Sequence, residues 1–160
     1  MNQQIDTSKG PGVYIPPPLI YALTFIAAIY IQKKIPLSDT IFRMTALKIT
    51  GVILLVIALF FLGKSLRQFR LTKNTAVLIK PASSLQTTGI YSISRNPMYV
   101  GLAILYVGIT CFIGNWWHIV LFPLLLIIVQ EYIIRREEKY LQLEFGQAYE
   151  AYKNKVRRWL

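Results

Sequence analysis

The sequence predicts an all-α protein: a polytopic membrane helix bundle of about four spans, with a C-terminal helical hairpin followed by an amphipathic cytoplasmic helix. Three observations support this prediction. Hydrophobic residues make up 54% of the 160 residues, more than the roughly 45–50% of soluble domains. The chain from Asn96 to Gln130 contains no Asp, Glu, Lys or Arg. The 18 basic residues lie mainly between and after the apolar stretches, where they orient a membrane protein.

The first half of the chain contains two apolar stretches. Leu19–Ile31 is short for a span, since a transmembrane helix needs about 20 residues, but we expect a first helix there. Thr45–Gly63 is long enough to span alone. From Lys64 to Gln86 the chain is basic and has no acidic residue, so we expect a cytoplasmic loop with at most one interfacial helix.

The apolar stretch after Asn96 is too long for one span, and Gly114-Asn115 is a turn signal near its middle. It therefore predicts a hairpin of two helices, Met98–Ile113 and Trp116–Gln130, whose outer ends return to the same membrane face. Pro97 sets the first turn of this hairpin.

Small and aromatic residues mark two further features of the hairpin. Gly101 and Gly108 lie seven residues apart on one helix face and predict close contact with a neighbouring helix. Trp116, Trp117 and His118 are expected in an aromatic belt at the opposite interface, far from the polar residues.

An amphipathic helix is predicted from Glu131 onward. Glu137 is surrounded, at helical spacing, by apolar residues, so we expect it to point into the apolar stripe, where a carboxylate is costly without a partner. Glu138 borders that stripe. Phe145-Gly146 is expected to bend or break the helix.

The hairpin is expected to bring Arg95 and Asn96 beside the charged residues that begin the last helix. Both termini and this polar cluster are predicted to face the cytoplasm, because about 14 of the 18 basic residues fall on that side. We treat residues 1–160 as one domain, in which 1–79 anchor the chain and 80–160 carry the site.

Composition also limits the function classes. Cys111 and His118 are the single cysteine and histidine, so we expect no intrachain disulfide and no metal site. The net charge of +11 is explained by the membrane-flanking positions of the basic residues and by anionic lipids, so no nucleic-acid partner is expected.

Several motifs resemble the isoprenylcysteine carboxyl methyltransferase family, which is related to membrane phospholipid N-methyltransferases. In order, they are Thr88-Gly89-x-Tyr91, Arg95-Asn96-Pro97-Met98-Tyr99-x-Gly101, the apolar hairpin, Glu137-Glu138-x-x-Leu141 and Phe145-Gly146-x-x-Tyr149-x-x-Tyr152. The resemblance covers about residues 83–158. It implies a membrane enzyme that transfers a methyl group from S-adenosylmethionine to a lipophilic or membrane-delivered acceptor.

The resemblance also implies roles for individual residues. The cofactor-binding residues it implies are Ser84, Leu85, Gln86, Tyr91, Asn96, Pro97, Met98, Tyr99 and Glu137. As our own hypothesis, we predict Glu137 and Arg95 to be catalytic residues, and we expect Arg135, Arg136 and Glu138 to face the acceptor. An acceptor carboxylate would need a cation such as Arg95, whereas an acceptor amine would need Glu137 or Glu138 as a base.

Two positions depart from the family pattern. The usual histidine of its R-H-P stretch is Asn96 here, which hydrogen-bonds but cannot act as a base near neutral pH. Family members that act on prenylcysteine carboxylates tend to keep an arginine one turn before the acidic pair, and Ile133 occupies that position here. Two alternatives remain open: a membrane reductase using a nicotinamide cofactor, and a non-enzymatic membrane binding or transport module.

Overall fold

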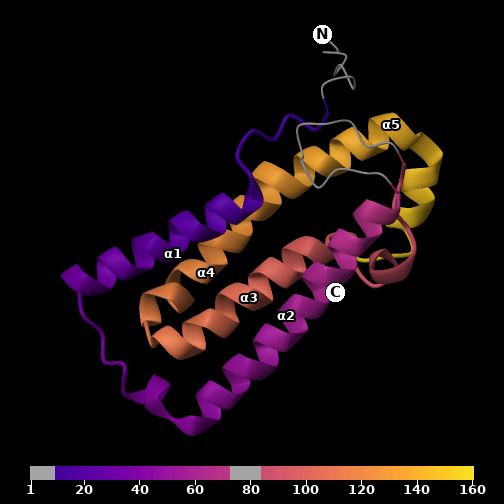
Figure 1. Cartoon of the computed structure of the whole chain (residues 1–160). Helices are drawn as coiled ribbons and strands as arrows, with labels where there is room; N and C mark the ends of the chain where they lie inside the picture. The colour runs from indigo at the N-terminus through magenta and orange to yellow at the C-terminus, as the bar shows by residue number, and fades with distance from the viewer. Residues whose placement is uncertain (1–9, 73–83) are drawn as a thin grey trace.

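Four apolar helices lie side by side in the computed structural model, which describes residues 10–72 and 84–160 (Figure 1). They are α1 (Pro17–Lys34), α2 (Thr45–Leu71), α3 (Pro97–Ile113) and α4 (Trp116–Ile128). Their order across the bundle is α1, α4, α3, α2. Short 3₁₀ helices η2 (Thr40–Arg43) and η3 (Gly89–Ser92) precede α2 and α3.

The helix after α4 changes pitch before it leaves the bundle. A π-helical segment, η4 (Val129–Ile134), joins α4 to α5 (Arg135–Lys153). A π turn adds a residue to the helical repeat and so rotates everything after it. Val129, Ile133 and Ile134 are completely buried there. The rotation sets the direction in which the acidic residues of α5 point.

Two helical segments are long and apolar enough to cross a bilayer, within the part of the chain that is described. They are Thr45–Leu71 and the continuous run Trp116–Lys155, which contain 18-residue windows of mean hydropathy 2.5 and 1.9. α3 is apolar but has 17 residues, and α1 has 18. The outward faces of α1 and α2 carry exposed large apolar side chains. The predicted all-α membrane bundle is therefore confirmed.

The core lies between α1, α3 and the α4–η4 helix. The side chains at its centre come from all three, and the N-terminal segment adds Val13. Its remaining buried members are Ile20, Tyr21, Tyr99, Tyr106, Leu125, Val129, Ile133 and Ile134.

α2 packs on the other side of α3 through glycine. A Cβ atom on Gly101 would come within 2.9 Å of Leu62 Cγ, and one on Gly108 within 3.1 Å of Leu55 Cδ2. The predicted seam of Gly101 and Gly108 is confirmed, because only glycine lets the two backbones lie this close.

Several predicted boundaries change. α1 begins at Pro17, before the predicted Leu19, and ends at Lys34, after the predicted Ile31. α4 ends at Ile128 rather than at Gln130. α2 does not stop at Gly63 but continues two turns into the basic segment predicted to be a loop. Ser65 is fully buried in this extension, and its hydroxyl donates to the Phe61 carbonyl. Within that predicted loop, residues 73–83 lie outside the described residues.

The tip of the hairpin docks on α1. The Asn115 side chain accepts from Trp117 N and donates to the Ala28 carbonyl at 3.1 Å, and Trp117 Nε1 donates to the Ile35 carbonyl at 2.9 Å. His118 is fully buried, with its ring centroid 4.0 Å from that of Phe25. His118 therefore lies inside the bundle rather than on its surface, and the interfacial belt at the tip stays a prediction. The neighbours of His118 in sequence do not reveal that α1 contacts it.

Candidate functional site

A tyrosine and a carboxylate meet where α3 begins. Tyr99 lies in the first turn of α3, where Pro97 fixes the helix start, and its hydroxyl donates to Glu137 Oε1 at 2.9 Å. Tyr21 of α1 donates to the Tyr99 carbonyl at 3.3 Å. Glu137 belongs to α5, in the first turn after the apolar segment. The hairpin thus brings residues 38 positions apart into direct contact.

The environment of Glu137 favours its neutral form. The side chain is partly buried. Burial raises the pKa of its carboxyl to about 8, the charge of Glu138 adds to the rise, and the hydrogen bond from Tyr99 opposes it. A carboxyl with this pKa exchanges a proton near neutral pH, which an ordinary glutamate does not do.

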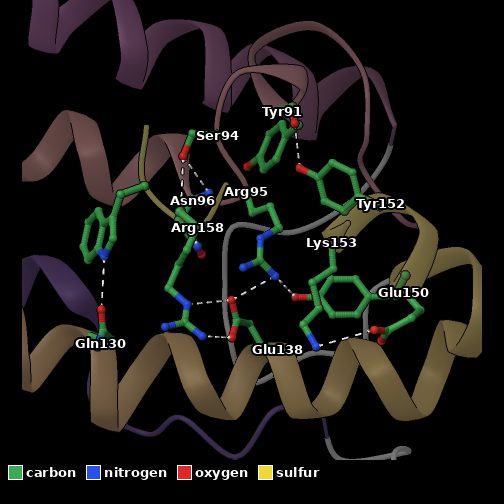
Figure 2. A network of polar contacts seen from close by, with 12 residues as sticks. Tyr91, Ser94, Arg95, Asn96, Gln130, Glu138, Glu150, Tyr152, Lys153 and Arg158 are labelled. Carbon is green, nitrogen blue, oxygen red and sulfur yellow. Dashed lines mark hydrogen bonds and ion pairs between the residues drawn. The ribbon is translucent and has the colours of Figure 1, made fainter. Parts of the chain in front are cut away.

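Tyr91 lies beside this pair and is buried. Its ring makes an edge contact with Phe69 near the end of α2, at 5.8 Å between centroids. Its carbonyl accepts a hydrogen bond of 2.6 Å from Tyr152 of α5 (Figure 2). Burial, followed by the nearby charge of Glu137, raises the pKa of the Tyr91 phenol well above its ordinary value. The phenol therefore stays protonated as a hydrogen-bond donor.

A second carboxylate, Glu138, is held by two arginines (Figure 2). Arg95 Nη1 lies 3.1 Å from Glu138 Oε1, and both side chains are mostly buried. Arg158 reaches both Glu138 oxygens, with distances of 2.9 Å from Nε and 2.7 Å from Nη2. Arg95 also donates to the Tyr149 hydroxyl at 3.3 Å. Such a two-point arginine contact fixes the carboxylate in orientation as well as charge.

The C-terminal tail, residues 154–160, is pinned to the corner before α3. Asn96 Nδ2 donates to the Arg158 carbonyl at 2.9 Å, and the Ser94 hydroxyl donates to the same oxygen at 3.3 Å. The Arg95 backbone N–H donates to the Arg157 carbonyl at 2.9 Å. In this structure Asn96 therefore holds the tail, and its assignment to the cofactor stays a prediction.

The predicted cofactor loop docks on the end of α2. Gln86 donates to Ser84 Oγ at 2.9 Å, and Gln68 of α2 donates to Gln86 Oε1 at 3.1 Å. Because Phe69 follows Gln68 in α2 and contacts Tyr91, this loop lies next to the tyrosines. Its other predicted members also have defined places: Leu85 is half-buried in the loop, and Pro97 and Met98 open α3.

Two predicted acceptor-facing residues lie on the outer side of the last helix. Arg135 forms an exposed ion pair with Glu131 at 2.6 Å. Arg136 donates to the Gly12 carbonyl at 3.1 Å and stacks over the Tyr132 ring. The structure therefore joins these arginines to the helix surface and to the N-terminal segment, and their predicted role remains untested.

An apolar groove of about 490 Å³ runs between α3 and the α4–η4 helix. Its rim includes one polar contact, from Trp159 Nε1 to Gln130 Oε1 at 3.2 Å. The groove is lined by Val100, Ala103, Ile104, Leu126, Ile127, Gln130, Trp159 and Leu160. Neither Tyr99 nor Glu137 lines the groove; Val100, the residue after Tyr99, is its lining residue nearest the start of α3.

Sequence reasoning missed Arg158 and Trp159 as members of the site. The sequence indicated only that the end of the chain is basic and carries an apolar stripe. Arg158 reaches Glu138 because the chain turns back after α5, and no residue pattern encodes the direction of that return. The one signal available in the sequence is that a basic residue, Arg158, follows the helix that carries the acidic pair Glu137-Glu138.

Sequence comparisons with known proteins cover most of the segments that form this site. The sequence model of the phospholipid methyltransferase family matches residues 47–148, which include most of α2, the Ser94–Asn96 corner, the hairpin and the acidic pair. No solved structure matches the chain significantly.

Two curated proteins match part of the chain. An uncharacterized protein of Haemophilus influenzae is 38% identical over 66 residues, 39% of this chain and 100% of that protein. The protein-S-isoprenylcysteine O-methyltransferase of Schizosaccharomyces pombe is 42% identical over 72 residues, 45% of this chain. The match spans only 30% of the length of the yeast enzyme.

Proposed function

Because the chain belongs to the phospholipid methyltransferase family and is a membrane methyltransferase, we propose that it transfers a methyl group from S-adenosylmethionine to a lipophilic acceptor delivered by the bilayer. The observation that carries this proposal is the Tyr99–Glu137 hydrogen bond of 2.9 Å at the start of the hairpin. This bond joins a titratable carboxyl to a tyrosine; Tyr91 lies nearby, and the groove residues Val100 and Trp159 belong to the same end of the bundle.

The residues present fit a cofactor of this kind. Glu137 is a partly buried carboxyl whose burial opposes its charge, so a ligand with an amino group or hydroxyl groups would supply the partner it needs. Tyr91 and Phe69 offer aromatic surface for a base. We expect Tyr91, Tyr99 and Glu137 to hold S-adenosylmethionine, together with the Ser84–Gln86 loop. The cofactor supplies an electrophilic methyl group on a sulfonium centre.

The remaining chemistry falls to the residues of the chain, which position the reactants and exclude water. The apolar groove between α3 and α4 would hold the hydrocarbon part of the acceptor, with its head group toward Tyr99. For an amine acceptor, Glu137 would take up the proton before transfer, since its pKa of about 8 suits a base near neutral pH. For a carboxylate acceptor no base is needed, and Arg95 would neutralise the charge while it shares Glu138.

The proposed orientation places this end of the bundle in the cytoplasm. Within the described residues, the Arg95–Glu138–Arg158 network and the ends of α2 and α5 lie at this end. Most basic residues of the sequence fall here as well, which favours the cytoplasmic side.

A transfer assay tests the proposal. The purified protein, reconstituted in phosphatidylcholine vesicles, is given S-adenosylmethionine labelled on its methyl group, with either phosphatidylethanolamine or N-acetyl-S-farnesylcysteine as acceptor. We expect label to enter the lipid fraction with one of them, and the preferred acceptor identifies nitrogen or carboxylate chemistry. Absence of transfer to both, combined with retention on an NADPH resin but not on an S-adenosylhomocysteine resin, would refute it in favour of the reductase alternative.

A further inference from the structure

The C-terminal tail lies outside residues 47–148, which match the family, yet it forms part of the site. Its backbone is held to the Ser94–Asn96 corner by the three hydrogen bonds described above, from Arg95 N, Asn96 Nδ2 and Ser94 Oγ. Such bonds order a segment that has no helix or strand of its own. The tail is therefore a fixed element of this end of the bundle.

Two successive side chains of the tail do different things. Arg158 reaches Glu138 with a two-point contact, whereas Trp159 packs against the core and bonds to Gln130. Gln130 and Glu138 lie along one stretch of the α4–α5 helix, as Figure 2 shows. Arg158 and Trp159 thus attach the tail to this helix at two points about two turns apart.

Trp159 occupies a particular place between these attachments. It lines the apolar groove together with residues of α3 and α4. Its indole N–H is directed to Gln130, the polar member of the groove lining. On the tail side it adjoins Arg158 and therefore the Glu138–Arg95 network. Trp159 thus lines the apolar groove, and the residue before it, Arg158, belongs to the charged corner.

We propose that Trp159 is a specificity-determining residue that contacts the apolar part of the acceptor, and that Arg158 is the positioning residue that keeps it there through Glu138. This inference rests on the proposed function, because it assigns the groove to the methyl acceptor. Trp159 forms the end wall against which the hydrocarbon chain stops, so it fixes how far the acceptor head group reaches toward Tyr99. Asn96 and Ser94 hold the backbone that carries both side chains.

The first test compares kinetic constants of tail variants in vesicles. Trp159→Ala removes the wall, and we expect the KM for the acceptor to rise about 10-fold while the KM for S-adenosylmethionine stays within about twofold of wild type, since an apolar wall of this size is worth a factor of 10 or more. Trp159→Phe keeps the ring and should restore most of the affinity. Arg158→Gln should shift the acceptor KM in the same direction.

Lys155→Gln is the matched control, because Lys155 is an exposed cation of the same tail and should change neither constant. An acceptor KM within about twofold of wild type in Trp159→Ala would overturn the proposal. So would an equal rise in both KM values, because the tail would then act on the cofactor or on the fold as a whole.

The second test needs no turnover. The other two tryptophans, Trp116 and Trp117, lie at the opposite end of the hairpin, so the double variant Trp116→Phe/Trp117→Phe leaves Trp159 as the only indole. We expect its fluorescence to shift saturably on titration with N-acetyl-S-farnesylcysteine or dilauroylphosphatidylethanolamine. Dodecylmaltoside at equal concentration should produce no saturable shift.

The two proposals fail in different ways. If no acceptor is methylated, the proposed function fails, and the fluorescence titration alone decides the role of Trp159. A saturable shift with either lipid then supports the contact, and its absence with both overturns it.

Discussion

The two ends of the helical hairpin both bury polar groups, but they do so in different ways. At the tip, Asn115 and Trp117 are neutral and donate to backbone carbonyls of α1 and the residue after it. At the other end, Glu137 and Glu138 are acidic, and their partners are a phenol and two guanidinium groups. Neutral groups bonded to the backbone stabilise a membrane helix pair at little cost, whereas buried charges are costly unless they are paired.

This difference indicates which end does chemistry. The tip has the one histidine of the chain, but this side chain is completely buried and its ring contacts Phe25 of α1 and Tyr106 of α3. The opposite end of the hairpin has an apolar groove and the carboxyl of Glu137, whose pKa is about 8. Perturbed titratable groups next to a cavity are typical of functional sites. The comparison supports our proposal that the tip anchors the hairpin and that methyl transfer takes place at the opposite end.

The largest expected effect comes from Glu137→Gln. Loss of the carboxylate should lower the rate of methyl transfer by about 100-fold, as for other residues that bind and move protons at a reacting centre. The fold should survive, because a glutamine side chain still accepts from Tyr99. Rates in vesicles measure the effect, with Glu150→Gln, an exposed acid of the same helix, as the matched control. Equal losses in both variants would contradict a specific role for Glu137 in the reaction.

A smaller effect, on stability, is expected for Arg95→Gln. Without Arg95, the mostly buried charge of Glu138 would be compensated by Arg158 alone. We expect the free energy of unfolding to fall by about 2–3 kcal/mol, somewhat less than the loss of a fully buried pair. Thermal unfolding in detergent measures it. In an Arg95→Gln/Glu138→Gln double variant the loss should be smaller than the sum of the single losses, and strict additivity would contradict the pairing.

The pH dependence of stability sharpens the contrast further. Burial raises the pKa of Glu137 to about 8, so between about pH 5 and 8 the folded protein holds a proton that the unfolded chain has released. Stability of the ligand-free protein should therefore decrease as pH rises through this range. In Glu137→Gln the decrease should be weaker. Unfolding midpoints measured from pH 5 to 8 test this, and parallel curves for the two proteins would exclude Glu137 as the titrating group.

The smallest effect is expected at the tip. Asn115→Ala removes the cap on Trp117 N and the bond to the Ala28 carbonyl, which should cost about 1–2 kcal/mol of stability. Methyl transfer at a temperature where the variant stays folded should be unchanged. A loss of activity at that temperature would show that the tip contributes to the reaction after all.

The sequence predicted the helices and the hairpin because these follow from local rules. An uncharged stretch too long for one span, with Gly114-Asn115 at its middle, leaves few other folds. The glycine seam of α3 could be predicted for the same reason, since Gly101 and Gly108 share a helix face. The extension of α2 past Gly63 was missed because a basic amphipathic helix and a basic loop have similar composition.

The site was predictable only in part. Glu137 was singled out because its helical neighbours are apolar, and the structure gives it Tyr99 as a partner. The partners of Glu138 could not be foreseen in full, because the direction in which the tail returns depends on the bend at Gly146, where φ is 49°, and on contacts with residues about 60 positions away. The sequence also did not show that Asn96 bonds to that tail.

The most direct test of the account is the equilibrium affinity for S-adenosylhomocysteine, measured by calorimetry on the detergent-solubilised wild type, Glu137→Gln and Glu150→Gln. If Glu137 helps to hold the methyl donor, its loss should weaken binding by about 10- to 100-fold, the value of a hydrogen bond to a charged group, and Glu150→Gln should bind like wild type. Equal affinity in all three proteins would contradict the central claim that the start of the hairpin and the acidic end of the last helix form the donor site.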